Sequence, residues 1–255
     1  MTRSQKVAIA CGSVTAIFLA GVAVTVLSLL MRANYGNKSA RAPMHFGLTN
    51  RVEIANHPGL QFRRGPFTIS FWFKTTTQQG YLSFLSKRRN TMGDGWVIHA
   101  QQDDTFLFYT AGCSSPTSSP QQFRDGQWHH LVLNRNGQTL TFYYDNQNVG
   151  SGPDTCDHNE VHPLCFGMDA DRDQAWHFEG ELAEIHIYNR ALSDSEIALE
   201  WNDGKGRKTA VPGGGLVAGY HFEDGGGGRY FDFSGNGHHG TIIHSPIMAH
   251  RRNDE

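Results

Sequence analysis

Many short runs of the chain alternate hydrophobic and polar residues and are divided by turn residues. In the clearest run, FTISFWFK, which begins at Phe67, every odd-numbered residue is Phe or Ile, and the even-numbered residues are Thr, Ser, Trp and Lys. Because successive side chains of a strand point to opposite faces of a sheet, this pattern predicts a half-buried strand. The predicted strands are Arg51–Ile54, Phe67–Thr75, Tyr81–Lys87, Trp96–Ala100, Thr105–Thr110, His129–Arg135, Thr139–Asp145, Leu164–Met168 and Glu181–Tyr188.

One hairpin and one helix can be placed from local signals. In LVLNRNGQTLTFYYD, the pair Asn136-Gly137 supplies the positive φ angles of a tight type I′ turn. In ALSDSEIALEWNDG, Ser193 can cap a helix, Glu196 completes the S-x-x-E capping box, and Gly204 follows the end. The rest of the pattern is β, so we expect an all-β, two-sheet antiparallel sandwich with one short helix.

A long hydrophobic stretch precedes these elements. Residues 7–31 contain no charge, and a helix of that length spans the hydrocarbon core of a bilayer. The stretch ends in LLMRANYG, without the small residues that precede a signal-peptide cleavage site, so we expect a single retained transmembrane helix. Residues 1–6 would form a cytoplasmic tail and residues 32–43 a stalk with a glycosylation sequon at Asn37. Basic residues flank both ends, so the positive-inside rule does not decide the orientation.

The charge balance excludes one class of partner. The chain has 22 Lys and Arg residues against 24 Asp and Glu residues, a formal net charge of -2. It therefore has no global basic field that would hold nucleic acid through counterion release.

A series of motifs follows the predicted strands. FTISFWFKT and YLSFLSKR precede DGQWHHLVLNRNGQTLTFYYDNQNVG, and FEGELAEIHIYNRALSDSEI comes last. In this order the segments resemble the laminin G-like, or pentraxin-like, branch of the concanavalin A-like lectin/glucanase superfamily. The resemblance covers residues 44–203 and implies a jelly-roll sandwich.

The segment that opens such domains stands at the C-terminus here. LVAGYHFEDGGGGRYFDFSGNGHHGTI, which begins at Leu216, is similar to the family's first strand and loop. The first and last strands of a jelly roll are neighbours, so we expect residues 216–255 to complete the jelly roll of their own chain after a linker at residues 204–215. In the alternatives, the segment starts a truncated second repeat, or it is donated to a neighbouring molecule and builds a homo-oligomer.

Members of this family often bind one calcium ion, which requires six to eight oxygen ligands. The resemblance places possible ligands at Asp232 and Asn236 in the DFSGNG loop and at Asn50, where the family has an acidic residue. Ala183 stands in place of a further Asp. With most anionic ligands lost, the resemblance implies a Ca²⁺ site that is weak or absent.

The family's usual function is recognition of glycans or extracellular proteins. Sugar binding uses aromatic faces and short polar side chains near turns, and the candidates here are Trp96, Tyr109, Trp176 and His177. Trp96 also suits the sandwich core, because aromatic residues of such strands commonly fill it.

Cys113, Cys156 and Cys165 follow the hydrophobic stretch. In an oxidising compartment Cys156 can close a short disulfide loop with Cys165, the pairing that we carry forward, or Cys113 can take one of them. The spacing CDHNEVHPLC also permits a zinc site through two Cys and two His, although no established motif has this spacing.

An enzymatic function can be examined on one strand. Retaining glucanases of this fold carry acidic residues at alternate positions of a strand, as nucleophile and general acid. Here Glu181 and Glu184 are three residues apart and are expected on opposite faces, and the pair Glu179 and Glu181 lacks the central Asp. The chain is therefore predicted not to be an enzyme.

These observations predict a single-pass membrane protein whose C-terminal domain is extracellular or lumenal. The domain is expected to be a non-catalytic binding or adhesion module for a glycan or an extracellular protein. A structural protein that self-assembles by C-terminal strand donation is the alternative, and a glycoside hydrolase is third.

Overall fold

The computed structural model describes residues 43–78, 80–88, 95–113, 116–168, 177–222 and 227–244. Among them, no helix is both long enough and apolar enough to cross a membrane. The predicted cytoplasmic tail, the transmembrane helix at residues 7–31 and the stalk up to residue 42, with Asn37, lie outside the described residues. Trp176 lies outside them as well.

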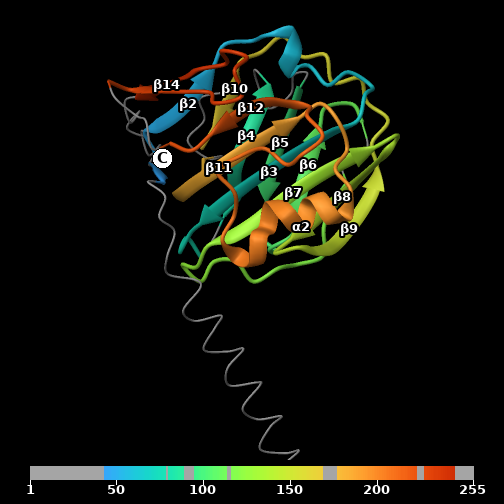
Figure 1. Ribbon diagram of the computed structural model, residues 1–255. Coiled ribbons are helices and arrows are strands. Elements are labelled where there is room, and N and C mark those ends of the chain that lie inside the picture. The colour runs from blue at the N-terminus through green and yellow to red at the C-terminus, as the bar shows by residue number, and fades with distance from the viewer. Residues whose placement is uncertain are drawn as a thin grey trace, which may run out of the picture. The chain divides into compact units, whose positions relative to one another are not determined.

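Two antiparallel sheets enclose the core (Figure 1). Sheet A has the order β1-β11-β3-β7-β8-β9, and β12 also pairs with β11. Its strands are β1 (Met44–Phe46), β11 (Gly180–Tyr188), β3 (Phe67–Lys74), β7 (His129–Asn136), β8 (Thr139–Tyr144), β9 (Gln147–Pro153) and β12 (Leu216–Tyr220). Sheet B runs β13 (Arg229–Tyr230), β14 (Gly240–His244), β2 (Asn50–Ile54), β10 (Leu164–Phe166), β4 (Leu82–Arg88), β5 (Gly95–Ala100) and β6 (Phe106–Thr110).

Helix α2 (Asp194–Trp201) is the one α-helix of the described residues, and two 3₁₀ turns, η1 (Pro58–Leu60) and η2 (Asn202–Gly204), complete the elements. The prediction of an all-β fold with two antiparallel sheets and one short helix is thus confirmed. Each strand predicted from alternation is present, with its ends within two residues of the expected positions.

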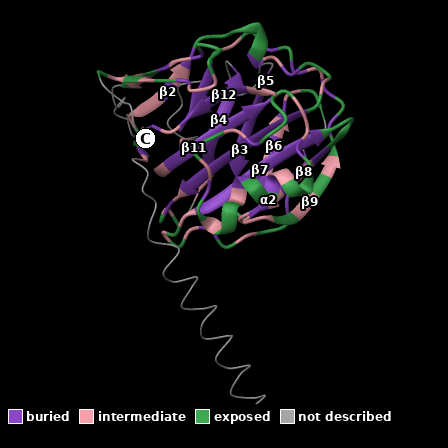
Figure 2. Cartoon of the chain, viewed as in Figure 1, coloured by how far each residue is buried: buried purple, intermediate pink, exposed green. Residues whose placement is uncertain are grey.

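The core between the sheets is largely aromatic. The odd-numbered residues of β3 have at most 1% exposed surface and belong to this core, as the alternation predicts, and the Phe73 ring lies 4.9 Å from the Phe84 ring of β4. The other face of β3 is buried too (Figure 2): Trp72 is 2% exposed and stacks on Trp201 of α2. The expectation of a half-buried strand is therefore wrong, because α2 packs on the outer face of sheet A.

Both hairpins of β7, β8 and β9 close with two-residue turns. Asn136 pairs with Thr139, so the first turn is Gly137-Gln138, and of these two residues only Gly137 has a positive φ, 62°. This pattern is typical of a type II′ turn, with Gly in the first position, rather than the expected type I′ turn. A pair with two positive φ angles closes the next hairpin, at Asp145 and Asn146.

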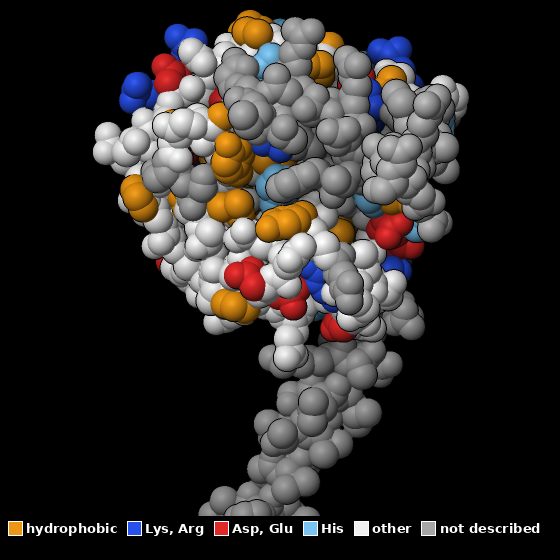
Figure 3. Space-filling model, turned by 180° about the vertical axis from the view of Figure 1, so that it is seen from behind, with side chains coloured by type: hydrophobic (Ala, Val, Ile, Leu, Met, Phe, Trp, Pro, Cys, Tyr) orange, Lys and Arg blue, Asp and Glu red, His pale blue; other side chains and the backbone are white. Residues whose placement is uncertain are grey.

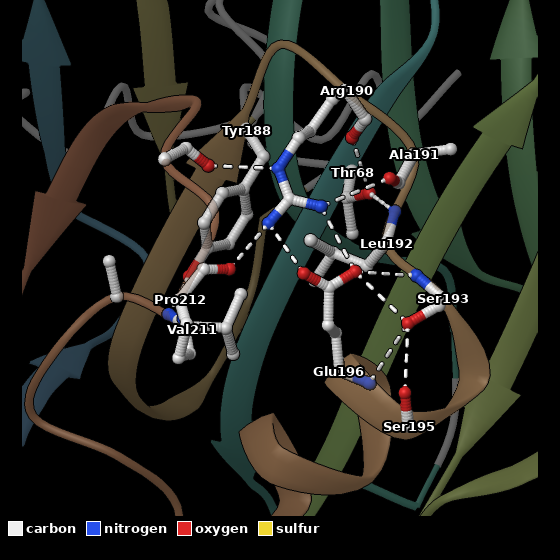
Figure 4. A network of polar contacts seen from close by, with 12 residues as sticks. Thr68, Tyr188, Arg190, Ala191, Leu192, Ser193, Ser195, Glu196, Val211 and Pro212 are labelled. Carbon is white, nitrogen blue, oxygen red and sulfur yellow. Dashed lines mark hydrogen bonds and ion pairs between the residues drawn. The ribbon is translucent and has the colours of Figure 1, made fainter.

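Helix α2 begins at the predicted cap. Ser193 and Glu196 form the capping box, each accepting a hydrogen bond from the backbone N–H of the other. The Glu196 carboxylate also accepts two hydrogen bonds from Arg190, at 2.7 and 3.0 Å (Figure 4). Arg190 donates further hydrogen bonds to the carbonyl oxygens of Pro212 and Gly214. One guanidinium therefore ties the start of α2 to the segment that leads into β12.

The C-terminal segment lies in both sheets of its own chain, since β12 pairs with β11 and β14 pairs with β2. The loop between these strands folds back over β12. A Cβ atom at Gly219 would lie 2.5 Å from the Phe233 ring, so only glycine lets this loop approach. Asp232 accepts a hydrogen bond from the Gly219 N–H at 2.9 Å and holds the loop there.

A β-bulge interrupts β11 between Ala183 and His186. Glu184, the extra residue, has a φ of 49° and reaches His221 on the outer side of sheet A. A bulge shifts the alternation of side chains by one position. The expectation that Glu181 and Glu184 lie on opposite faces assumed an unbroken strand and is therefore wrong.

Candidate functional site

Trp96 lies in the core and not in a ligand site. Its side chain is 1% exposed and packs against the rings of Phe62 and Phe108, with centroid distances of 6.1 and 5.7 Å. Alternation along β5 turns Trp96 inward with Ile98 and Ala100. The prediction that Trp96 contacts a ligand is therefore wrong.

Tyr109 and His177 lie near the outer side of sheet B. Tyr109, on the edge strand β6, pairs with Val97 and is half-buried. The backbone of His177 bridges Met168, and its carbonyl oxygen accepts a hydrogen bond from Ser83 at the start of β4. Tyr109 is therefore on β6, His177 lies beside the start of β4, and β5 pairs with both of these strands.

We call the outward-facing residues of β4, β5, β6 and β10 the sheet B face. Strand pairing sets them in rows across the sheet, with His99 between Ser83 and Leu107, and Val97 between Ser86 and Tyr109. The face comprises Ser83, Ser86, Arg88, Val97, His99, Leu107, Tyr109 and Cys165.

A basic and an aromatic side chain lie next to each other on the sheet B face. The Arg88 guanidinium carbon lies 5.4 Å from the centroid of the Tyr109 ring, a cation–π distance. Burial, with a further contribution from the Arg88 charge, lowers the pKa of His99 to about 3. His99 is therefore neutral at physiological pH and has one nitrogen that can donate a hydrogen bond and one that can accept.

The middle of the sheet B face is buried, and its β6 side is more open. Val97, His99 and Cys165 are at most 1% exposed, whereas Leu107 and Tyr109 are half-buried. Figure 3, seen from behind, shows hydrophobic side chains on this side of the molecule, with histidine and basic side chains among them. A half-buried aromatic ring on an edge strand suits a ligand with an apolar face.

The calcium ligands implied by the resemblance are used in hydrogen bonds within the chain. Both carboxylate oxygens of Asp232 already accept two hydrogen bonds each, from the N–H groups of Gly219, Ser234 and His238 and from the Ser234 hydroxyl. A carboxylate used in this way closes the loop and has little capacity left for a cation.

Asn236 and Asn50 also have structural roles. Asn236 donates through its side-chain amide to the carbonyl oxygens of Leu216 and Val217. Asn50 closes the turn between β1 and β2 by accepting from Gly47 and donating to His45. These residues do not fit a calcium site, which needs several free oxygens directed at one point.

The disulfide joins Cys113 and Cys156, with Cα atoms 6.2 Å apart, within the usual range for such bonds. This finding corrects the predicted pairing of Cys156 with Cys165. Cys165 is buried and takes no part in a disulfide, and it lies in the middle of sheet B, where β10 pairs with β2 and β4. Of the alternatives left open by the sequence, the structure adopts the one in which Cys113 takes Cys156.

The loop before β10 is held by buried charges and not by zinc. Cys156 is in the disulfide, and His158 Nε2 bonds to Asp154 Oδ2 at 2.9 Å. Burial disfavours the charged imidazole, but Asp154 and Glu160 outweigh it and raise the pKa of His158. Lys87 Nζ donates to the carbonyl oxygens of Glu160 and His162, and its burial lowers its pKa to about 8.

Arg88 and His99 are not among the residues predicted from the sequence. The signal for His99 was present, since alternation from an inward Trp96 turns residues 97 and 99 outward. The position of Arg88 over Tyr109 depends on the pairing of β4, β5 and β6, and this pairing cannot be predicted from the residues of one segment alone.

This chain is similar to several solved structures. A candidate carbohydrate-binding protein from Bacteroides ovatus matches with a TM-score of 0.60 and 13% identity, over 78% of this chain and 57% of that protein. The heptameric SAP-like pentraxin from Limulus polyphemus matches with a TM-score of 0.49 and 12% identity, over 79% and 97%. Domains LG4-5 of the mouse laminin alpha1 chain match with a TM-score of 0.42 and 17% identity, over 56% and 44%.

At these identities the likeness shows the fold alone. The chain spans little more than half the length of the Bacteroides ovatus protein. A search of curated protein sequences found no match. A family model, described as the concanavalin A-like lectin/glucanases superfamily with the name Laminin_G_3, matches residues 46–198, more than half of the chain. The laminin G-like resemblance is thereby confirmed, and the chain belongs to the concanavalin A-like lectin/glucanase superfamily.

Proposed function

We propose that this domain is a non-catalytic binding module that recognises a glycan, or a glycan-bearing extracellular protein, at the sheet B face. The observation that carries the proposal is the half-buried Tyr109 ring on edge strand β6 with Arg88 over it. Sugars stack on aromatic rings through their C–H faces. Arg88 is 2% exposed, so it acts on the Tyr109 ring and does not itself contact a ligand.

The acidic residues of β11 support binding over hydrolysis. Retaining glycosidases need two carboxyl groups about 5 Å apart across the scissile bond. Glu181 is engaged by Lys74 at 2.7 Å, and Glu184 bonds to His221. Both belong to sheet A, on the opposite side of the sandwich from the sheet B face.

We further propose that the domain is displayed outside the cytoplasm, anchored by residues 7–31. The Cys113–Cys156 disulfide supports this placement, because such bonds form and persist mainly in oxidising compartments. Digestion of sealed membrane vesicles tests it. Protease added to vesicles whose cytoplasmic side faces out should leave the domain intact, and protease added to vesicles of the opposite orientation should cleave it. A reduced Cys113 in the native protein would contradict the proposal.

The ligand site is tested with the full chain in detergent on a glycan array, followed by calorimetry with the best glycan. Tyr109→Ala should lower the affinity by about tenfold or more, because the stacking ring is lost. Phe231→Ala is the matched control: Phe231 is an aromatic residue that is 47% exposed and lies after β13, outside the sheet B face.

Three outcomes separate the parts of this proposal. Loss of affinity in Tyr109→Ala with unchanged binding in Phe231→Ala supports the sheet B face. The reverse result would move the site to the C-terminal loop. An array on which no glycan is selected would reject the glycan class of ligand.

A further inference from the structure

Three potential metal ligands come together on the outer side of sheet A. Glu184 and His186 lie on β11, and His221 follows β12, which pairs with β11. One ligand atom from each lies within 4.8 Å of the others. Glu184 Oε2 and His221 Nδ1 are already 2.8 Å apart.

The bulge in β11 creates this cluster. Without the extra residue, Glu184 and its neighbours would alternate between the core and the outside, and Glu184 would point away from His221. The left-handed backbone of Glu184, with φ of 49°, is strained for a residue other than glycine, asparagine or aspartate. Strain of this kind persists only where the surrounding structure imposes it, and it is concentrated at functional sites.

His186 is the residue of this cluster that points most strongly to metal binding. The residue has no exposed surface, and its Nδ1 bonds to Glu200 Oε2 of α2 at 2.8 Å. Its Nε2 has no hydrogen-bond partner among the described residues. A buried polar atom without a partner has lost its hydrogen bonds to water and has formed no bond in the protein to replace them. Such atoms are rare in folded proteins and need an explanation.

The surroundings of His186 match those of a metal-bound histidine. Metal-binding imidazoles usually hold a carboxylate through the other ring nitrogen, which fixes the ring and leaves one nitrogen for the metal. Glu200 serves this role here and is itself fixed by the Tyr188 hydroxyl, which also accepts a hydrogen bond from Val211 N–H. Burial raises the pKa of Glu200, but His186 and Tyr188 outweigh it and keep the pKa below its usual value.

His221 gives the cluster one accessible side. Its side chain is 17% exposed, compared with 1% for Glu184. The Phe233 ring stacks on the His221 ring at 4.1 Å between centroids and limits its movement. In a tetrahedral site with metal–ligand bonds near 2.0 Å, the ligand atoms are about 3.3 Å apart. The widest ligand-atom spacing therefore has to shorten by at most about 1.5 Å, and the 2.8 Å spacing of Glu184 and His221 has to open by about 0.5 Å, which side-chain rotations provide.

We propose that Glu184, His186 and His221 bind one divalent transition-metal ion of the zinc class, with Glu200 as the outer partner of His186. Two imidazoles and one carboxylate favour Zn²⁺ over Ca²⁺, which requires a shell of oxygens. A dication also balances the two carboxylates that this cluster buries, Glu184 and Glu200. Three protein ligands leave a fourth position for water or a ligand on the His221 side. The site is independent of the sheet B face.

The test uses the full chain, purified in detergent and stripped of metal with a chelator. Titration with Zn²⁺ against a chromogenic chelator should show one tight site per chain, and an excess of Ca²⁺ should not compete. Co²⁺ should bind in the same place and give the intense visible absorption of a tetrahedral complex, a signature that a purely structural hydrogen-bond cluster cannot produce.

His221→Gln should lower Zn²⁺ affinity by about 100-fold or more, and Glu200→Gln by about 10 to 100-fold, because outer partners matter nearly as much as ligands. His244→Gln is the matched control, since His244 is exposed at the end of β14, away from the cluster. Circular dichroism of each metal-free variant checks that it is folded, and His221 is partly exposed, so its replacement should not unfold the domain.

The proposal is overturned if the native chain binds no stoichiometric Zn²⁺. It is equally overturned if His221→Gln, shown to be folded, binds Zn²⁺ as tightly as the native chain. Tetrahedral Co²⁺ absorption that disappears in His221→Gln and remains in His244→Gln supports it.

Discussion

The outer faces of the two sheets are covered in different ways. The outer face of sheet A is covered by α2, whose Trp201 stacks on Trp72 with ring centroids 5.1 Å apart. The sheet B face is open at β6, where Tyr109 is half-buried, and the chain beyond β6 is tied down by the Cys113–Cys156 disulfide. One face is covered by a helix, and beside the other a disulfide fixes the chain that follows β6.

This difference separates stability from recognition. Polar side chains under α2 are arranged in bonded pairs, such as His186 with Glu200 and Ser70 with His130. Replacing them should disturb folding or metal binding. Residues at the open side of the sheet B face have fewer contacts to lose, so their replacement should change ligand binding more than folding.

The largest effect is expected for Trp72→Ala. The ring is 2% exposed and packs against the rings of both Trp201 and His130, so its removal leaves a cavity under α2. Replacing a buried tryptophan by alanine costs about 3 to 5 kcal/mol. Urea unfolding followed by circular dichroism measures the loss. A fall in the free energy of unfolding below about 1 kcal/mol would show that packing of α2 on Trp72 contributes little to stability.

Reduction of the disulfide is expected to have the next largest effect. The bond joins residues 43 positions apart, and cross-links of this length stabilise by about 3 to 4 kcal/mol, mainly by restricting the unfolded chain. Urea unfolding with and without reductant checks the value. A variant with Cys113→Ser and Cys156→Ser serves as control and should not respond to reductant.

A smaller effect is expected for Glu196→Gln, which weakens the tie between α2 and Arg190. Hydrogen bonds from Arg190 and from Ser193 lower the pKa of Glu196 to about 2 from its usual 4.5. Because the folded pKa is the lower one, the stabilisation is complete above about pH 4.5 and disappears as the pH falls toward 2.

We expect Glu196→Gln to cost about 1 kcal/mol at pH 7, as is typical for the loss of a helix cap. The difference from the native chain should vanish near pH 2 in urea unfolding. Glu181→Gln is the matched control, because it removes an isolated, partly exposed ion pair with Lys74 and should cost about 0.5 kcal/mol or less. Equal costs at both pH values would contradict the role of the Glu196 charge.

The smallest effect on stability is expected for Tyr109→Ala. The side chain is half-buried on an edge strand, so the free energy of unfolding should fall by about 1 kcal/mol or less. Thermal melting provides the comparison with Trp72→Ala. If the two variants were equally destabilised, the contrast between the two faces would be wrong.

Prediction from sequence succeeded where the signal was local. The alternation in β3 identified its core face, and the S-x-x-E pattern placed the start of α2 at Ser193. It failed for Trp96, where an aromatic residue beside a turn has the same local appearance in a core and in a ligand site. It also failed for the disulfide, because Cys113 and Cys156 are brought together by strands distant in sequence.

The proposed zinc-class cluster shows the same division between local signals and long-range contacts. Strand periodicity is a property of neighbouring residues, so the chain's own pattern decides which segments are strands and which faces are apolar. The bulge that turns Glu184 outward, the return of residues 216–220 beside β11 and the approach of Glu200 from α2 are all long-range events. They depend on which surfaces pack together to exclude water, and only the folded chain determines that.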